Sequence, residues 1–255
     1  MTTMSSRIDG KVVLLTGATG GLGSATARRI ADEGGSLVLT DLDVTACEAL
    51  AETLADTPGR HTAMSLDVAV EHQWRTVAST VEREYGRLDG LVNNAAIGSI
   101  ATVEDEEVEH WDRVMAIGVN GVWLGMKHCG PLIAAAGGGS IVNLSSILGT
   151  VGGFGNSAAY QAAKGAVRTM TKNAALHWAT SGVRVNSLHP GFIGTDQLLE
   201  RHEGSERHAA MLAGTPMARL GRGDEIASVV AFLVSDDSTF MTGSEVYADG
   251  GWTAA

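Results

Sequence analysis

The sequence predicts a single α/β domain, in which helices cover both faces of a doubly wound parallel sheet. Apolar runs of strand length alternate with helix-length periodic segments almost from end to end, which is the pattern of successive βαβ units. The 255 residues, 44% of them hydrophobic, can bury one substantial core. Glycine is abundant at 33 residues and proline scarce at 4, which favours tight turns over linkers. We therefore expect one domain over 1–255, without internal repeats.

Seven segments are typical of strands because they are short and rich in Leu or β-branched residues. They are Val12 to Thr16, Leu37 to Thr40, Thr62 to Leu66, Leu88 to Asn93, Ser140 to Ser145, Val183 to Leu188 and Glu245 to Tyr247. Between them, helices are predicted over 22–34, 44–56, 71–85, 104–136, 157–181 and 223–235. Asp224 and Glu225 favour the start of the last helix, since negative charge stabilises a helix N-terminus.

The charge balance excludes several partner classes. A formal net charge of −11 repels nucleic acid backbones and anionic membrane surfaces, so neither is expected as a partner. Cys47 and Cys129 have no Cys/His ligand spacing, which argues against a disulfide framework and a metal site. The first seven residues lack an apolar targeting core, and no stretch is long and apolar enough to cross a membrane. We expect a cytoplasmic protein.

The first strand is followed by a glycine turn and a helix start, Thr16-Gly17-Ala18-Thr19-Gly20-Gly21-Leu22-Gly23. Glycines let a backbone approach a diphosphate closely, and the N–H groups of the helix start can hold it without a basic side chain. The spacing is G-x-x-x-G-x-G rather than G-x-G-x-x-G, so a ligand-free βα turn is the alternative.

Asp41, at the end of the second predicted strand and 18 residues after Gly23, favours a dinucleotide ligand. A carboxylate there can accept both ribose hydroxyls of an adenosine and repels a 2′-phosphate. Neither the glycine turn nor Leu42 supplies a cation, so the prediction is NAD(H) rather than NADP(H). Asp67, which closes the third strand, can accept from an adenine amino group, and the alternative for both carboxylates is a local cap.

Tyr160 and Lys164 lie four residues apart on an alanine-rich predicted helix, so they share one face. A nearby cation lowers the pKa of a phenol, as a general acid/base for a hydroxyl proton requires. The alternative is an ordinary buried Tyr beside a surface Lys. No charged residue occurs from His128 through Ala163, which predicts a buried segment and leaves Lys164 either desolvated or on an outer face.

These features occur together with Asn93-Asn94-Ala95, Ser146 and His189-Pro190-Gly191-x-Ile193-x-Thr195. In that order and at those distances they resemble the short-chain dehydrogenase/reductase family over nearly the whole chain. The chain is most similar to its cyclic-alcohol and hydroxysteroid dehydrogenases, over Ser140 to Gly194 and Gly221 to Trp252. The resemblance implies a Rossmann-type domain, a homotetramer, and an enzyme that interconverts a secondary alcohol and its ketone.

The resemblance also implies roles for individual residues. Tyr160 is the acid/base, Lys164 lowers its pKa and binds the nicotinamide ribose, and Ser146, preferred over Ser145, holds the substrate oxygen. Asn120 matches the family's fourth member, which holds a water that links Lys164 to solvent, and its alternative is a polar kink in a helix. The cofactor contacts implied are Gly17, Thr19, Gly20, Gly21, Leu22, Gly23, Asp41, Leu42, Asp67, Val68, Asn94, Ala95, Ala96, Tyr160, Lys164, Pro190, Gly191, Ile193 and Thr195. Ala96 departs from the family's Asn-Asn-Ala-Gly by one methyl group.

The substrate pocket is predicted to be apolar, suited to a cyclic or steroid-like alcohol. Residues 196–220 alternate apolar side chains with a charged middle in the manner of a mobile lid. His202 and His208 lack a recognised metal-ligand spacing, so 201–208 is interpreted as a solvated loop. The predicted lining residues are Ile147, Leu148, Phe154, Phe192 and Leu198.

Two other functions remain open at this point. One is a 3-ketoacyl thioester reductase, which Asp41 and the acidic charge disfavour, and the other is a non-catalytic NAD-binding scaffold or sensor. The alanines of the predicted helix from Ser157 to Thr180 permit close helix contacts between subunits, in agreement with a homotetramer, or tight packing onto the sheet.

Overall fold

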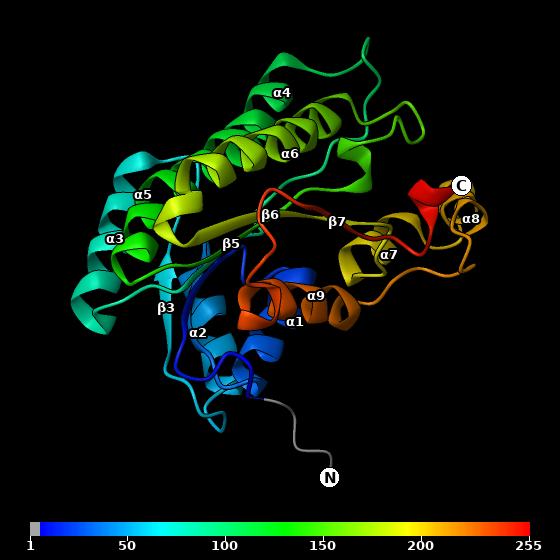
Figure 1. The fold of residues 1–255 in the computed structure, drawn as a ribbon. Coiled ribbons are helices and arrows are strands. Elements are labelled where there is room, and N and C mark those ends of the chain that lie inside the picture. Colours follow the sequence, from blue (N-terminus) through cyan, green and yellow to red (C-terminus); the bar gives the residue numbers. More distant parts are fainter. Residues whose placement is uncertain (1–5) are drawn as a thin grey trace.

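The computed structural model describes residues 6–255, and it contains one sheet of seven strands in the order β3-β2-β1-β4-β5-β6-β7 (Figure 1). All neighbouring strands are parallel. The chain winds outward from β1 to β3 and restarts on the other side of β1 at β4, which confirms the predicted doubly wound α/β fold. The strands are β1 (Val12–Thr16), β2 (Ser36–Asp41), β3 (His61–Ser65), β4 (Gly90–Asn93), β5 (Gly139–Leu144), β6 (Val183–Pro190) and β7 (Glu245–Ala248).

The helices agree with the predicted ones at five of six places, with ends shifted by a few residues. They are α1 (Gly21–Asp32), α2 (Val44–Thr53), α3 (Glu71–Tyr85), α4 (Val108–Met115), α5 (Gly121–Ala135), α6 (Ala158–Trp178), α7 (Asp196–His202), α8 (Glu206–Gly214) and α9 (Gly223–Val234). Short helical turns lie at η2 (Ile147–Gly149), η3 (Ala179–Ser181), η4 (Asp236–Ser238) and η5 (Trp252–Ala254). Among residues 6–255, no helix is long and apolar enough to cross a bilayer.

The helix predicted over 104–136 is present as an unbroken helical stretch from Val108 to Ala135, but it starts four residues later than predicted and contains an irregular turn. The structure has α4 and α5 joined by a π-helical stretch, η1 (Ala116–Asn120), and the helix starts only at Val108. Glu106, just before it, is held by side-chain and backbone contacts instead: its carboxylate accepts hydrogen bonds from the Ser99 hydroxyl and from the N–H of Ala159, the latter at 3.3 Å. Residues before Val108 therefore form a loop that packs against the start of α6.

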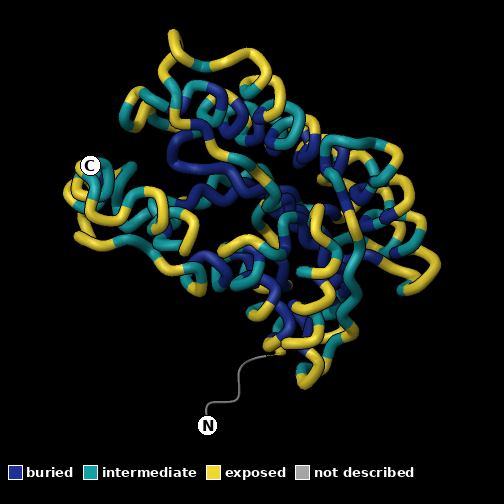
Figure 2. The backbone as a smooth tube through the Cα atoms, turned by 180° about the vertical axis from the view of Figure 1, so that it is seen from behind, coloured by how far each residue is buried: buried dark blue, intermediate teal, exposed yellow. Residues whose placement is uncertain are grey.

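Two apolar layers enclose the sheet, because alternate residues of each strand face opposite sides. Val13 and Leu15 of β1 belong to the cluster shared with α1, α2 and α9. Val12 and Leu14 belong to the cluster shared with α3, α5 and α6. Figure 2 shows the resulting buried centre, with exposed backbone gathered on the outer helices and loops. Several alanines of α6, including Ala163 and Ala175, are buried within the chain, so packing inside one subunit accounts for them.

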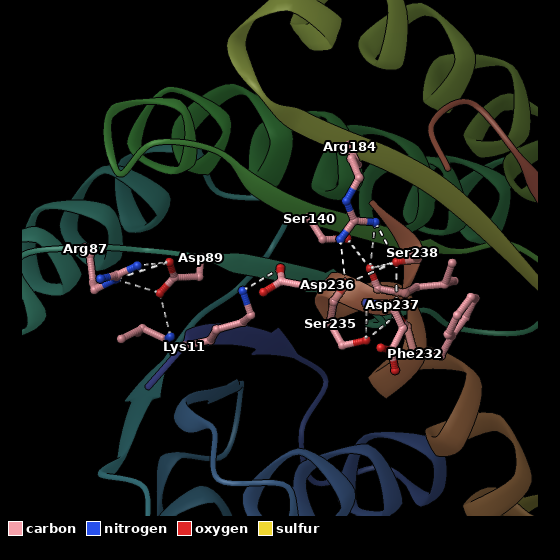
Figure 3. A network of polar contacts seen from close by, with 12 residues as sticks. Lys11, Arg87, Asp89, Ser140, Arg184, Phe232, Ser235, Asp236, Asp237 and Ser238 are labelled. Carbon is pink, nitrogen blue, oxygen red and sulfur yellow. Dashed lines mark hydrogen bonds and ion pairs between the residues drawn. The ribbon is translucent and has the colours of Figure 1, made fainter. Parts of the chain in front are cut away.

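Polar contacts close the amino edge of the sheet (Figure 3). The Asp89 carboxylate accepts a hydrogen bond of 2.8 Å from the N–H of Val12, where β1 begins. Arg184 at the start of β6 donates to the carbonyl of Leu233 at 3.0 Å and to the hydroxyl of Ser238 at 2.7 Å. These groups satisfy one another, which leaves the carboxyl edge as the open side of the sheet, where doubly wound folds bind ligands.

Candidate active site

A cavity of about 550 Å³ opens at the carboxyl edge of the sheet, within the usual size of a ligand pocket. It brings together every residue predicted to contact the cofactor, from Gly17 to Thr195, including Tyr160 and Lys164. It also includes Ser146 and four of the five predicted substrate residues, Ile147, Leu148, Phe192 and Leu198. Two predicted site residues, Asn120 and Phe154, do not line it.

The glycine turn is tightly closed and fixed by the end of β4. Gly17 has a φ of +62°, and a Cβ there would lie 2.9 Å from the Cα of Ala95. A Cβ on Gly23 would lie only 2.0 Å from the Gly17 carbonyl oxygen, so neither position accepts a side chain. The Asn94 amide donates to the carbonyls of Thr16 and Gly17, both at 2.9 Å. The start of α1 is thus presented to the cavity with the geometry that binds diphosphates.

Asp41 lies beside this turn and is locked in place by it. One carboxylate oxygen accepts from the N–H of Thr19 at 3.1 Å and from its hydroxyl at 2.6 Å, and the other accepts from the N–H of Leu42 at 2.8 Å. Among the described residues, no Lys or Arg from the loops after β1, β2 or β3 lines the cavity. This end is therefore suited to a neutral diol rather than to a phosphate monoester. Asp67 lines the same end, and one of its oxygens accepts from the N–H of Ala69 at 2.9 Å, so the local-cap alternative applies to it as well.

Lys164 is buried, with 3% of its surface exposed, which rules out the outer-face alternative. Its ammonium donates to the Leu144 carbonyl at 2.6 Å and lies 5.6 Å from the centre of the Tyr160 ring. Burial lowers the pKa of Lys164 to about 8. Burial raises the pKa of Tyr160, and hydrogen bonding with Ser146 opposes that rise. The lowering of the Tyr160 pKa by Lys164 stays a prediction.

The two serines after β5 have different partners. The Ser145 hydroxyl donates to the carbonyl of Lys164 at 2.9 Å and so ties the strand to α6. The Ser146 hydroxyl accepts from the N–H of Leu148 at 3.1 Å and is the hydrogen-bonding neighbour of Tyr160. Ser146 is therefore the serine beside Tyr160, and its contact with a substrate oxygen stays a prediction.

His189 supports this serine and was not recognised as a site residue from the sequence. It is fully buried, and its ring nitrogens lie 3.1 Å from the Ser146 carbonyl and 2.8 Å from the Ser187 hydroxyl. A neutral ring satisfies both contacts when Nδ1–H donates to the carbonyl and Nε2 accepts from Ser187. Burial lowers the pKa of His189, which favours this neutral form.

The structure corrects the placement of Asn120. The residue is exposed at the end of η1, outside the cavity. Gly118 is instead the buried residue of this stretch, and a Cβ there would lie 3.2 Å from the Cβ of Ala163 on α6. A π-helical turn changes which residues face a neighbouring helix, so a match to the family's sequence pattern does not by itself place a side chain at this point. Asn120 fits its alternative, a polar residue at an irregular point of the helix.

Phe154 is also misplaced by the sequence analysis. Its ring stacks on Phe192 at 5.6 Å and meets the edge of Trp252 at 5.8 Å, behind the wall of the cavity. Phe192, on which it stacks, does line the cavity. Within 128–163, the predicted burial is correct along β5, up to Leu148 and at Cys129, Ile133, Ala159 and Ala163, whereas much of Thr150 to Asn156 is exposed.

The interpretation of 201–208 as a solvated loop is wrong. The segment carries the end of α7 and the start of α8, and Arg201, His202 and Arg207 line the cavity. The signals that could have revealed the helices are Thr195 and Ser205, which cap them by accepting from N–H groups three residues ahead. The solvated-loop interpretation rested on the lack of a metal-ligand spacing, which does not indicate whether basic side chains line a cavity.

The two ends of the α7–α8 segment, at Ile193 and Gly221, lie side by side and form its narrow base. Ile193 and Gly221 form a parallel bridge, and Gly194 and Gly221 donate to the carbonyls of Gly221 and Phe192, both at 2.9 Å. Figure 1 shows α8 beside the C-terminus. There, Met217 donates to the Gly250 carbonyl at 3.1 Å. The segment is thus anchored at its base and along one flank while it borders the cavity.

A solved structure titled as a short-chain type dehydrogenase/reductase from Mycobacterium marinum superposes with a TM-score of 0.92, at 30% identity, and 97% of each chain is covered. The family model described as "Enoyl-(Acyl carrier protein) reductase" matches residues 17–253. The chain belongs to the short-chain dehydrogenase/reductase family. This confirms the resemblance seen in the sequence and identifies the chain as an oxidoreductase of that family.

Members of the family with curated names are similar over the full length. Cyclohexanol dehydrogenase of Acinetobacter sp. (strain SE19) is 38% identical over 252 residues, with 98% of each chain covered. The NADP-dependent (R)-specific alcohol dehydrogenase of Lentilactobacillus kefiri is 37% identical over 254 residues, 98% of this chain and all of that one. Relatives of comparable similarity thus include one named for NADP, so the cofactor preference has to be argued from this chain's own residues.

Proposed function

We propose that this protein is an NAD(H)-dependent dehydrogenase that interconverts a cyclic secondary alcohol and its ketone. The observation that carries the proposal is the meeting of Tyr160, Ser146 and the buried Lys164 in the cavity that also holds the glycine turn and Asp41. The cyclohexanol dehydrogenase relative supports a cyclic alcohol as substrate. The buried side chains of Ile147 and Leu148 offer an apolar wall for its ring.

In the proposed mechanism, Ser146 orients the substrate hydroxyl and Tyr160 takes its proton in the direction of oxidation. The nicotinamide group supplies the hydride acceptor when the cofactor is bound. Lys164, held by Leu144, places a cation near the phenol and favours the phenolate at the moment of proton transfer. His189 keeps the Ser146 backbone in place through its carbonyl.

The preference for NAD(H) rests on Asp41, whose carboxylate is already oriented by Thr19 and Leu42. A 2′-phosphate at this place would meet that negative charge with no cation beside it. We also propose that 196–220 acts as a lid over the substrate, since α7 and α8 border the cavity. A cytoplasmic location and a homotetramer, the latter supported by family resemblance, remain predictions.

The proposal is tested by following absorbance of the reduced nicotinamide with cyclohexanol, offering NAD⁺ and NADP⁺ in parallel. Turnover with NAD⁺ is expected, and Tyr160→Phe is expected to abolish it. Tyr85→Phe is the matched control, because Tyr85 on α3 bonds Thr62 and lies outside the cavity. Preference for NADP⁺ would contradict the Asp41 argument. Tight NADH binding without turnover of any alcohol would favour a scaffold or sensor, and turnover confined to 3-ketoacyl thioesters would favour the reductase alternative.

A further inference from the structure

The wall of the cavity formed by α7 and α8 is positively charged, although the whole protein is acidic. Arg201, His202 and Arg207 line it. Arg201, Arg207 and His208 all lower the pKa of His202, together with burial, so the charged groups that act on this histidine are all basic. The acidic residues of α7, α8 and the turn between them are exposed and do not line the cavity, whereas Arg201, although also exposed, does line it; these acidic residues are Asp196, Glu200, Glu203 and Glu206.

This positive charge has no internal counter-ion. Within residues 6–255, neither Arg201 nor Arg207 forms an ion pair. Most other arginines near an acidic side chain are paired, for example Arg168 with Glu245 at 2.8 Å. An uncompensated guanidinium inside a pocket favours binding of an anion.

Arg207 is fixed in position by neutral groups. Its Nη1 donates to the Asn156 side-chain oxygen at 2.7 Å, and its guanidinium carbon lies 4.9 Å from the centre of the Phe154 ring. Its Nε atom is buried and has no hydrogen-bond partner among residues 6–255. Burial lowers the pKa of Arg207, which shows that the charge is partly desolvated without compensation. The side chain is thus ordered in advance for a ligand, and the entropy cost of fixing a long side chain on binding is reduced.

The partners of Arg207 place it relative to the reacting groups. Asn156 and Phe154 belong to the segment that runs from Ser146 to Tyr160, so α8 is attached to the same loop that presents the catalytic hydroxyls. The apolar residues at the start of that segment line the cavity as well. The cavity therefore offers a proton acceptor, an apolar wall and a fixed guanidinium to one ligand.

We propose that the substrate is a cyclic alcohol that carries a carboxylate, and that Arg207, with Arg201 and His202 beside it, binds the carboxylate while the hydroxyl lies at Tyr160 and Ser146. This inference rests on the proposed function and narrows its substrate class. A guanidinium group is planar, and two of its N–H groups can donate parallel hydrogen bonds to the two oxygens of a carboxylate. The expected apolar pocket is thus corrected to one that is apolar along one wall and cationic at the lid.

The test compares trans-4-hydroxycyclohexanecarboxylate with trans-4-methylcyclohexanol at saturating NAD⁺. Wild type is expected to prefer the acid. Arg207→Gln is expected to lower kcat/KM for the acid by roughly 10- to 100-fold, mainly through KM, as loss of a charge-assisted hydrogen bond implies. For trans-4-methylcyclohexanol, the same substitution is expected to change kcat/KM by less than about threefold. Arg28→Gln is the matched control, since it removes one positive charge from the exposed face of α1.

A second variant separates anion binding from a structural contact between lid and loop. Asn156→Ala removes a hydrogen-bond partner of Arg207 and leaves the guanidinium charge in place. The preference of the protein for the acid over the methyl compound is expected to persist in this variant. Equal losses for both alcohols in Arg207→Gln would overturn the proposal and assign Arg207 to holding the lid. A rise in KM for NAD⁺ with both alcohols would also overturn the proposal, because it would show that Arg207 binds the phosphates of the cofactor.

Binding of cyclohexanecarboxylate, measured by calorimetry, gives a readout independent of turnover. Wild type is expected to bind it at least about tenfold more tightly than Arg207→Gln does. If that difference is found but no alcohol is oxidised, the proposed function fails and the carboxylate site stands. If cyclohexanol is oxidised and neither binding nor kinetics favours the carboxylate, the proposed function stands and this inference fails.

Discussion

Lys164→Met is expected to change how the stability of the protein depends on pH. In the folded chain the ammonium is buried and its pKa is about 8, whereas 10.5 is its ordinary value. Between these values the unfolded chain binds more protons than the folded one, so the free energy of unfolding of the wild type rises with pH. The cost of burying the charge is fully present below pH 8 and is relieved as the pH approaches 10.5. Methionine has a similar length and no charge, so it lacks this dependence.

One pKa unit corresponds to about 1.4 kcal/mol, and the wild type should therefore gain about 2 kcal/mol relative to Lys164→Met between pH 7 and pH 9.5. Urea denaturation of both proteins at four pH values in this range measures the difference. Lys127→Met, at a half-exposed lysine of α5, is the control and should show no such trend. A flat or falling difference for Lys164→Met would refute the desolvation argument.

Three further outcomes are expected. Asp41→Ser should raise the ratio of kcat/KM for NADP⁺ to that for NAD⁺ at least about tenfold, because the carboxylate that repels a 2′-phosphate is lost; an unchanged ratio argues against this role. Asn120→Ala should leave kcat within about twofold, since the side chain is exposed outside the cavity. A tenfold fall in kcat would instead show that Asn120 contributes to the active site. Arg168 and Lys172 hold the pKa of Glu245 at about 2. Glu245→Gln should therefore lower the free energy of unfolding at pH 7, and urea denaturation should show the gap narrowing as the pH falls from 5 to 3.

The sheet and the nucleotide half of the cavity could be predicted because backbone geometry dictates them. Gly17 and Gly23 occupy positions that exclude a Cβ, and Asp41 ends a strand whose register places it beside the turn. Such constraints leave a direct mark on the sequence.

The remainder depended on contacts between distant elements. Resemblance to the family's pattern led to Asn120, but the π-helical turn brings Gly118 to α6, and a glycine carries no side chain that would signal this. The charged residues of 201–208 read as solvated because the partners of Arg207, Asn156 and Phe154, lie some fifty residues earlier in the chain. Local charge could not show that these side chains face a cavity.

The narrow base of the α7–α8 segment has a consequence for how new activities arise in this fold. Its two ends, at Ile193 and Gly221, are already joined by backbone hydrogen bonds, so exchange of the residues between them leaves the chain closure unchanged. Tyr160 and Lys164 of α6, and Ser146 after β5, lie outside this interval. We therefore expect exchange of these residues to change the part of the substrate selectivity that α7 and α8 contribute, while Tyr160, Lys164 and the apolar wall of Ile147 and Leu148 stay in place.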